Sequence, residues 1–232
     1  MNRYVLRFYK KGNIRFLSHL DLVRLFKRAV RKGRIDVGFS NGYNPHELVN
    51  IVQPLSLGYE TDCDYFEIDT MSEHDPAELM EALNEALPEG LGFFDCRQAE
   101  RTPEYLSNKT AYALYEAVFG LKSDAEMPCA DAFLAQDIIT ITKKDKKTKN
   151  DVEKDVKSFI KELVIFRNPD GTAAARMMLR CASNETLNPG KLLQSLFKFY
   201  NIDTDVAECR ITRKDIYAER PDGELVPLFR TY

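Results

Sequence analysis

The sequence has no tryptophan, no long apolar run and no closely spaced pair of cysteines. A helix that crosses a bilayer needs about 20 consecutive apolar residues, and no stretch of this chain approaches that length. The first residues alternate between polar and apolar side chains, unlike the apolar core of a signal peptide. We therefore expect a cytoplasmic protein without a membrane anchor.

Cysteine is scarce and scattered, because the chain has five cysteines and the closest two, Cys181 and Cys209, are 28 positions apart. Zinc sites built on thiolates need pairs two to four residues apart, so none is expected here. The sequence also has no phosphate-binding loop of the NTPase kind, no glycine fingerprint for dinucleotides and no zinc-protease helix motif. We expect reduced thiols, no metal and no cofactor.

The charge of the chain is distributed unevenly. Residues 1–34 contain eleven lysines and arginines and one acid, Asp21, which gives +10. Because the whole chain carries -3, residues 35–232 carry -13. A basic segment on an acidic body favours a specific anionic partner over general adhesion.

Two α+β modules are expected from the length of 232 residues and from the order of the periodic segments. In residues 1–103 we expect a strand at 3–9, a helix at 18–32, strands at 48–57 and 65–69, a helix from residue 75 and a strand at 92–100. This β-α-β-β-α-β order is that of the ferredoxin-like fold. Residues 104–232 repeat it in degenerate form, and a lysine-rich insertion near 143–161 is interpreted as a mobile hairpin.

The first expected helix has one apolar and one cationic face. At 100° per residue, Leu22, Phe26 and Val30 fall on one arc. The opposite arc carries Arg24, Lys27, Arg28 and Arg31, and Asp21 is the only acid at helical spacing. Several cations on one face can neutralise several phosphates, which makes RNA the favoured ligand, although an ordinary solvated face is the simpler alternative.

Two histidines flank this helix in the sequence. His19 follows the expected cap Ser18, where backbone N–H groups favour an anion, and His46 lies in the turn-rich loop 39–46. If the two converge beside Arg15, they form a phosphate-binding pocket or, less favoured, an acid-base pair for metal-independent RNA cleavage. The candidate RNA- or anion-binding residues are Arg15, Ser18, His19, Arg24, Lys27, Arg28, Arg31, Asn44 and His46.

Four acids alternate along a later run, at Asp62, Asp64, Glu67 and Asp69. Carboxylates in one row are able to hold a hard metal ion. A solvated strand face is the preferred interpretation.

Three segments of the chain carry a resemblance to a known family: Arg15-Phe16-Leu17-Ser18-His19-Leu20-Asp21-Leu22, Asn44-Pro45-His46 and Gln53-Pro54-Leu55. Together they resemble the uncharacterised radical-SAM-associated domain family. The resemblance spans nearly the whole chain and is strongest over residues 3–60. In that family a proline usually follows the loop histidine, whereas this chain has Glu47. Members occur alone or as a C-terminal module of radical SAM enzymes, so the resemblance implies a radical SAM partner. The chain lacks the three-cysteine motif that holds the iron-sulfur cluster of those enzymes. It is also distantly similar, at the level of the fold, to CRISPR repeat-processing endoribonucleases.

Three functions follow as hypotheses. The first is an RNA-binding adaptor without catalytic activity that delivers a structured RNA to a radical SAM modifying enzyme. The second is a metal-independent endoribonuclease that uses His19 and His46. The third is a scaffold whose basic helix docks on an acidic surface of the partner protein.

Overall fold

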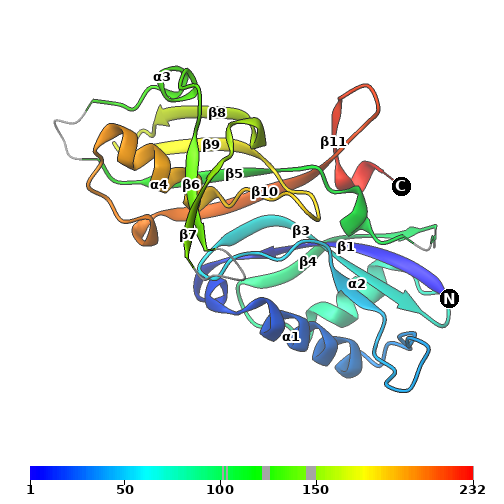
Figure 1. Ribbon diagram of the computed structural model, residues 1–232. Coiled ribbons are helices and arrows are strands. Elements are labelled where there is room, and N and C mark those ends of the chain that lie inside the picture. The colour runs from blue at the N-terminus through cyan, green and yellow to red at the C-terminus, as the bar shows by residue number, and fades with distance from the viewer. Residues whose placement is uncertain (101, 103, 122–125, 145–149, 232) are drawn as a thin grey trace. The chain divides into compact units, whose positions relative to one another are not determined.

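The computed structural model describes residues 1–100, 102, 104–121, 126–144 and 150–231 and shows a mixed α+β protein (Figure 1). By their internal contacts the residues form two units. Unit 1 comprises Met1–Thr110 and Arg213–Tyr232, and unit 2 comprises Ala111–Thr212. The division of the chain into consecutive modules at residue 103 stays a prediction. Among the described residues, no helix is both long and apolar enough to cross a membrane.

Unit 1 is built on an antiparallel sheet. Its central strand β1 (Asn2–Lys10) pairs with β3 (Glu60–Thr70) on one side and with β4 (Leu91–Ala99) on the other. The short strand β2 (Val49–Ile51) and β10 (Arg210–Glu219) both pair with β3, and β11 (Leu225–Pro227) pairs with β10. The β-α-β-β-α-β order expected for this region is confirmed.

Two helices, α1 (His19–Lys32) and α2 (Pro76–Asn84), cover one face of this sheet (Figure 1). Phe26 of α1 packs among Phe8 and Phe93 of the sheet, with ring centroids 5.1 and 5.0 Å away. Ser18 caps α1 by accepting from the Asp21 N–H, and Gly33 ends the helix, as the sequence predicts. These contacts fix which side of α1 is buried.

The opposite face of the sheet is covered by irregular segments. One contains Thr102, Glu104 and the 3-10 turn Leu106–Lys109. The other contains β11 and the turn Leu228–Arg230. Side chains alternate along a strand, so Arg3 and Arg7 of β1 point to this face while Tyr4 and Phe8 point to the helices. Both faces of the strand are therefore buried over most of its length.

The strand expected at 48–57 is much shorter than predicted, since only Val49–Ile51 is extended and paired. Beyond it, the carbonyls of Gln53 and Pro54 accept hydrogen bonds from the buried Arg213 side chain, at 2.9 and 3.3 Å. Pro54 has no N–H to donate to a ladder. The sequence pattern showed the apolar residues of this segment but not the arginine that holds its backbone.

Unit 2 contains the antiparallel strands β5 (Tyr112–Phe119), β9 (Ala173–Arg180) and β8 (Ile160–Arg167), with β9 in the middle. Helix α4 (Pro189–Tyr200) packs on them through Phe197, whose ring centroid lies 5.0 Å from that of Phe119. A short helix α3 (Ala130–Leu134) completes the core with Phe133. The sequence pattern predicts strands at 111–119 and 173–181 and a helix opened by Asn188-Pro189, and the observed elements agree with these to within a few residues.

The lysine-rich insertion begins as a hairpin. Strand β6 (Thr140–Lys144) pairs antiparallel with β7 (Asp151–Asp155), and their side chains are mostly exposed. Residues 145–149 of the predicted insertion lie outside the described residues. The expected hairpin is thus confirmed for its two strands.

Candidate nucleic-acid interface

The outer side of α1 presents cations to solvent. Arg24 and Arg31 have side chains that are 76% and 69% exposed, and Arg28 is exposed as well. Arg28 has no carboxylate partner among the described residues. Arg24 donates to Asp21 at 2.9 Å, but an exposed pair of this kind contributes little and separates readily for a better anion.

Glu47 lies outside α1 but forms ion pairs with two of its cations, Lys27 and Arg31, which the sequence does not predict. Its carboxylate accepts from Arg31 at 2.7 and 2.9 Å and lies 3.0 Å from the Lys27 ammonium. Burial favours the neutral acid, but the hydrogen bonds from Arg31 and Lys27 outweigh it and lower the pKa of Glu47. One carboxylate from the neighbouring loop therefore neutralises part of the predicted cationic face, while Asp21 is the only acid of α1 itself, as the sequence shows.

Glu47 also fixes the loop beside α1. Phe39 and Glu47 form an antiparallel bridge at the base of the loop, and the Ser40 hydroxyl accepts from the His46 N–H at 3.1 Å. Gly42 has a φ of 124°, which a side-chain-bearing residue rarely adopts. Tyr43 next to it is fully exposed. A planar aromatic ring is thus exposed on the loop whose base contacts Lys27 and Arg31 through Glu47.

The two candidate catalytic histidines do not meet. Glu47, next to His46, reaches Lys27 and Arg31, which are eight and twelve residues beyond His19 on α1. At about 1.5 Å per residue these contacts lie roughly 12 to 18 Å along the helix from His19. The convergence expected from the sequence is therefore not found.

Each histidine has a local role instead. The Nδ1 atom of His46 lies 2.8 Å from the Ser40 hydroxyl of its own loop. His19 is half-buried in the first turn of α1, and this desolvation lowers its pKa. The N-terminus of α1 is occupied by the reciprocal contacts of Ser18 and Asp21, which disfavours a second anion there.

Arg15 and Asn44 complete the candidate set. The Arg15 guanidinium lies 3.6 Å from Glu60 and over the ring of Phe16, 4.9 Å from its centroid. Asn44 is exposed in the loop. The Arg15 side chain thus contacts Glu60 and Phe16, and Asn44 lies at the surface of the loop.

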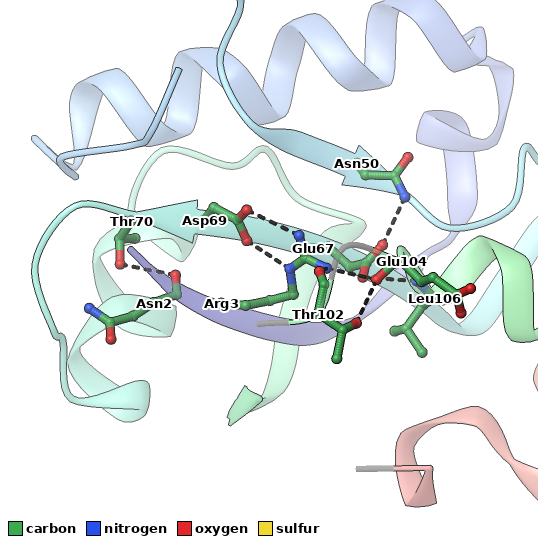
Figure 2. Close-up of polar contacts among 9 residues, drawn as sticks. All are labelled: Asn2, Arg3, Asn50, Glu67, Asp69, Thr70, Thr102, Glu104 and Leu106. Carbon is green, nitrogen blue, oxygen red and sulfur yellow. Dashed lines mark hydrogen bonds and ion pairs between the residues drawn. The ribbon is translucent and has the colours of Figure 1, made fainter. Parts of the chain in front are cut away.

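The cations of β1 are used differently from those of α1. Arg3 forms two hydrogen bonds to Asp69, at 2.7 and 3.1 Å, and donates to the Thr102 and Glu104 carbonyls (Figure 2). In the same cluster Glu67 accepts from Asn50 and from the Leu106 N–H. Burial raises the pKa of Glu67, and these hydrogen bonds oppose that effect. Figure 2 shows how this network ties β1 and β3 to the segment that covers them.

A second buried pair joins β3 and β10. Arg213 donates to both oxygens of Asp64 at 2.7 Å, and both residues are at most 2% exposed. Lys10, also buried, donates to the Arg15 carbonyl at 3.3 Å. The interpretation of Asp64, Glu67 and Asp69 as a solvated face is therefore wrong, because all three are buried and hydrogen-bonded.

None of the described side chains forms a group of three or more metal-ligating residues. Burial raises the pKa of Cys63 and of Cys96 to about 12, so both thiols stay protonated.

A model of the family described as "Uncharacterized protein conserved in bacteria (DUF2344)" matches residues 3–189. The chain belongs to this family. The matched segment includes β1, α1, the loop with Glu47 and the buried acids of β3. No curated protein matches the chain.

The sequence of α1 shows that one carboxylate can contact two of its cations, but it does not show which carboxylate does so. Lys27 and Arg31 are four residues apart on α1, so one carboxylate can reach both. Glu47 is separated from them by a loop, and no periodicity connects the two segments. Its role depends on tertiary structure and follows only from the fold.

Proposed function

We propose that the protein is an RNA-binding adaptor that acts with a radical SAM modifying enzyme. The observation that carries the proposal is the outer face of α1, where Arg24, Arg28 and Arg31 are exposed. Arg31 contacts Glu47 at the base of the loop that exposes the ring of Tyr43. Cations track a phosphate backbone, and an exposed ring stacks on a base. The two features together favour RNA over a small anion.

The fold supports the same proposal. We propose that both units are ferredoxin-like modules, the second degenerate, because β1 pairs antiparallel with β3 and β4, and β9 with β5 and β8. Sheets of this kind are common in RNA-binding domains. Fold alone does not assign function, so the weight rests on the exposed cations.

The radical SAM partner is supported by the resemblance of residues 15–22, 44–46 and 53–55 to the radical-SAM-associated family. The chain itself lacks the cysteine motif for the iron-sulfur cluster, so any modification chemistry belongs to the partner. Purification of the protein from its native cells, with and without ribonuclease, tests this. Recovery of neither RNA nor a radical SAM protein contradicts the proposal.

The RNA surface is tested by fluorescence anisotropy with labelled cellular small RNA. The variant Arg24→Glu, Arg28→Glu, Arg31→Glu is expected to lose binding that the wild type shows at low salt. A control, Lys161→Glu, Lys198→Glu, Arg210→Glu, reverses the same number of exposed charges in unit 2 and is expected to bind nearly as the wild type does.

Two results decide against the proposal. Equal loss in both variants means that only net charge matters. Absence of RNA binding by the wild type, with salt-sensitive binding to the partner protein, assigns the α1 surface to protein docking instead.

A further inference from the structure

A second set of planar groups lies on the sheet face of unit 1 that α1 and α2 leave open. Strands β1 and β4 present Arg7, Phe94 and Arg97 there. The Arg7 guanidinium carbon lies 4.9 Å from the ring centroid of Phe94. The register pairs Arg7 with Asp95 and Val5 with Arg97, so the two arginines stand on neighbouring strands of one face.

Phe229 is placed on these groups by the turn Leu228–Arg230. Its ring centroid lies 5.3 Å from the guanidinium carbon of Arg7 and 4.3 Å from that of Arg97. The ring of Tyr65 is 6.3 Å away, at an interplanar angle of 38°. Phe229 is only 4% exposed. One ring thus occupies a position bounded by two guanidiniums and a second aromatic ring.

The position is open at its edge. Phe94 is 41% exposed, and Arg97 is exposed and has no carboxylate partner among the residues that the structure describes. An interior built for packing alone would use apolar side chains, whereas guanidiniums over a ring stack on any flat π system. An exposed guanidinium beside a stacking position also provides the charge that a phosphate needs.

The segment that carries Phe229 is attached over a short length. Strand β11 pairs with β10 through only three residue pairs, from Tyr217–Pro227 to Glu219–Leu225. The turn that follows is closed by its own hydrogen bonds, from the Thr231 N–H and hydroxyl to the Leu228 carbonyl. Opening of this segment exposes its buried side chains Val226, Leu228 and Phe229, but it requires no break in the pairing of β1 with β3 and β4.

We propose that Arg7, Arg97, Phe94 and Tyr65 form a nucleobase-stacking site for single-stranded RNA, and that Phe229 occupies it in the free protein. When the turn lifts, a base takes the position of the Phe229 ring and Arg97 contacts the adjoining phosphate. This inference rests on the proposed RNA function for the class of its ligand, but it does not depend on the surface of α1.

The test measures binding of a labelled oligouridine of about 12 nucleotides by anisotropy. Phe229→Ala removes the resident ring and is expected to bind about tenfold more tightly than the wild type. Adding Arg97→Met, which changes an exposed residue, is expected to cancel the gain. Both are also measured with Arg24, Arg28 and Arg31 changed to Glu, so a failure of the α1 surface is seen separately.

Phe229→Leu keeps most of the apolar burial but has no flat ring, and thermal unfolding establishes which variants are folded. If the Phe229→Ala variant does not fold, the Phe229→Leu variant takes its place in the binding test. The Phe229→Leu variant is also expected to bind the oligonucleotide more tightly than the wild type does. A folded variant that binds the oligonucleotide no better than the wild type overturns the inference. So does a gain that persists unchanged after Arg97→Met.

Discussion

Strand β1 and helix α1 supply most of the cations in residues 1–34, but the two sets differ in how far their side chains are buried. On β1, Arg3 and Lys10 are buried, and Arg3 forms two hydrogen bonds to Asp69. On α1, Arg24 and Arg31 remain largely exposed, and Arg28 has no acidic partner in the described part of the chain. The charge of +10 is therefore a sum of two populations with different roles.

The difference shows why charge counts overstate a binding surface. The buried Arg3 is committed to Asp69, because removing either partner leaves an uncompensated buried charge. A cation on the helix surface is available to an external anion at little cost to stability. Only the second population is available for the proposed binding to RNA.

The largest effect is expected for Arg3→Met, which leaves Asp69 buried without its guanidinium. Unpairing a buried ion pair costs about 3 to 5 kcal/mol, so the free energy of unfolding in urea is expected to fall by that order. Arg28→Met, in the same basic segment but on the surface, is expected to change it by no more than about 0.5 kcal/mol. Equal losses in the two variants contradict the division into two populations.

A pH effect is expected from Glu67 in the cluster of Figure 2. Its pKa is raised in the folded protein, so between the ordinary value near 4.5 and the raised value the folded state binds more protons than the unfolded one. Stability from this group is present at low pH and declines as pH rises through that window. Glu67→Gln, which cannot ionise, is expected to remove this decline in urea titrations above pH 4.5. A slope that is unchanged in the variant assigns the effect to other groups.

A smaller effect on stability is expected for Glu47→Gln, which releases Lys27 and Arg31. The pKa of Glu47 is lowered, so its contribution is present above the ordinary value and is lost as pH falls through the lowered value. Because Arg31 is largely exposed, the loss at neutral pH is expected to stay within about 1 kcal/mol. RNA binding is expected to strengthen several-fold, since two cations become available. Weaker RNA binding in this variant means that Glu47 orders the surface rather than blocking it.

The smallest effect on stability is expected for Tyr43→Ala, because the side chain is fully exposed. The free energy of unfolding should stay within about 0.5 kcal/mol of the wild-type value. RNA affinity should nonetheless fall about tenfold, the scale of one base stacked on an aromatic ring. Unchanged affinity places the RNA path away from the loop.

The local elements of this protein could be predicted from the sequence because they rest on local signals. The period of apolar residues predicts α1, the Ser18 cap and Gly33 set its ends, and alternation predicts β1. The apolar residues of α1 are the ones that pack against Phe8 and Phe93.

The partners of the charged residues could not be predicted in this way. Arg213 lies 149 positions from Asp64, and 66 positions separate Arg3 from Asp69. No spacing rule links residues so far apart, and alternating acids have the same pattern on a solvated strand as on a buried one. For the same reason, the sequence does not predict the ion pair of Glu47 with Lys27 or the position of the Phe229 ring over Arg7 and Arg97.

The salt dependence of RNA binding tests the central claim most directly. Each phosphate contact contributes about one to the slope of log K against log salt. We expect the slope to fall by about two in Arg24→Met, Arg28→Met and to stay unchanged in Lys198→Met, since Lys198 is an exposed cation of α4 in unit 2 and does not belong to the α1 surface. The same slope in all three proteins contradicts the claim that the exposed cations of α1 bind the RNA.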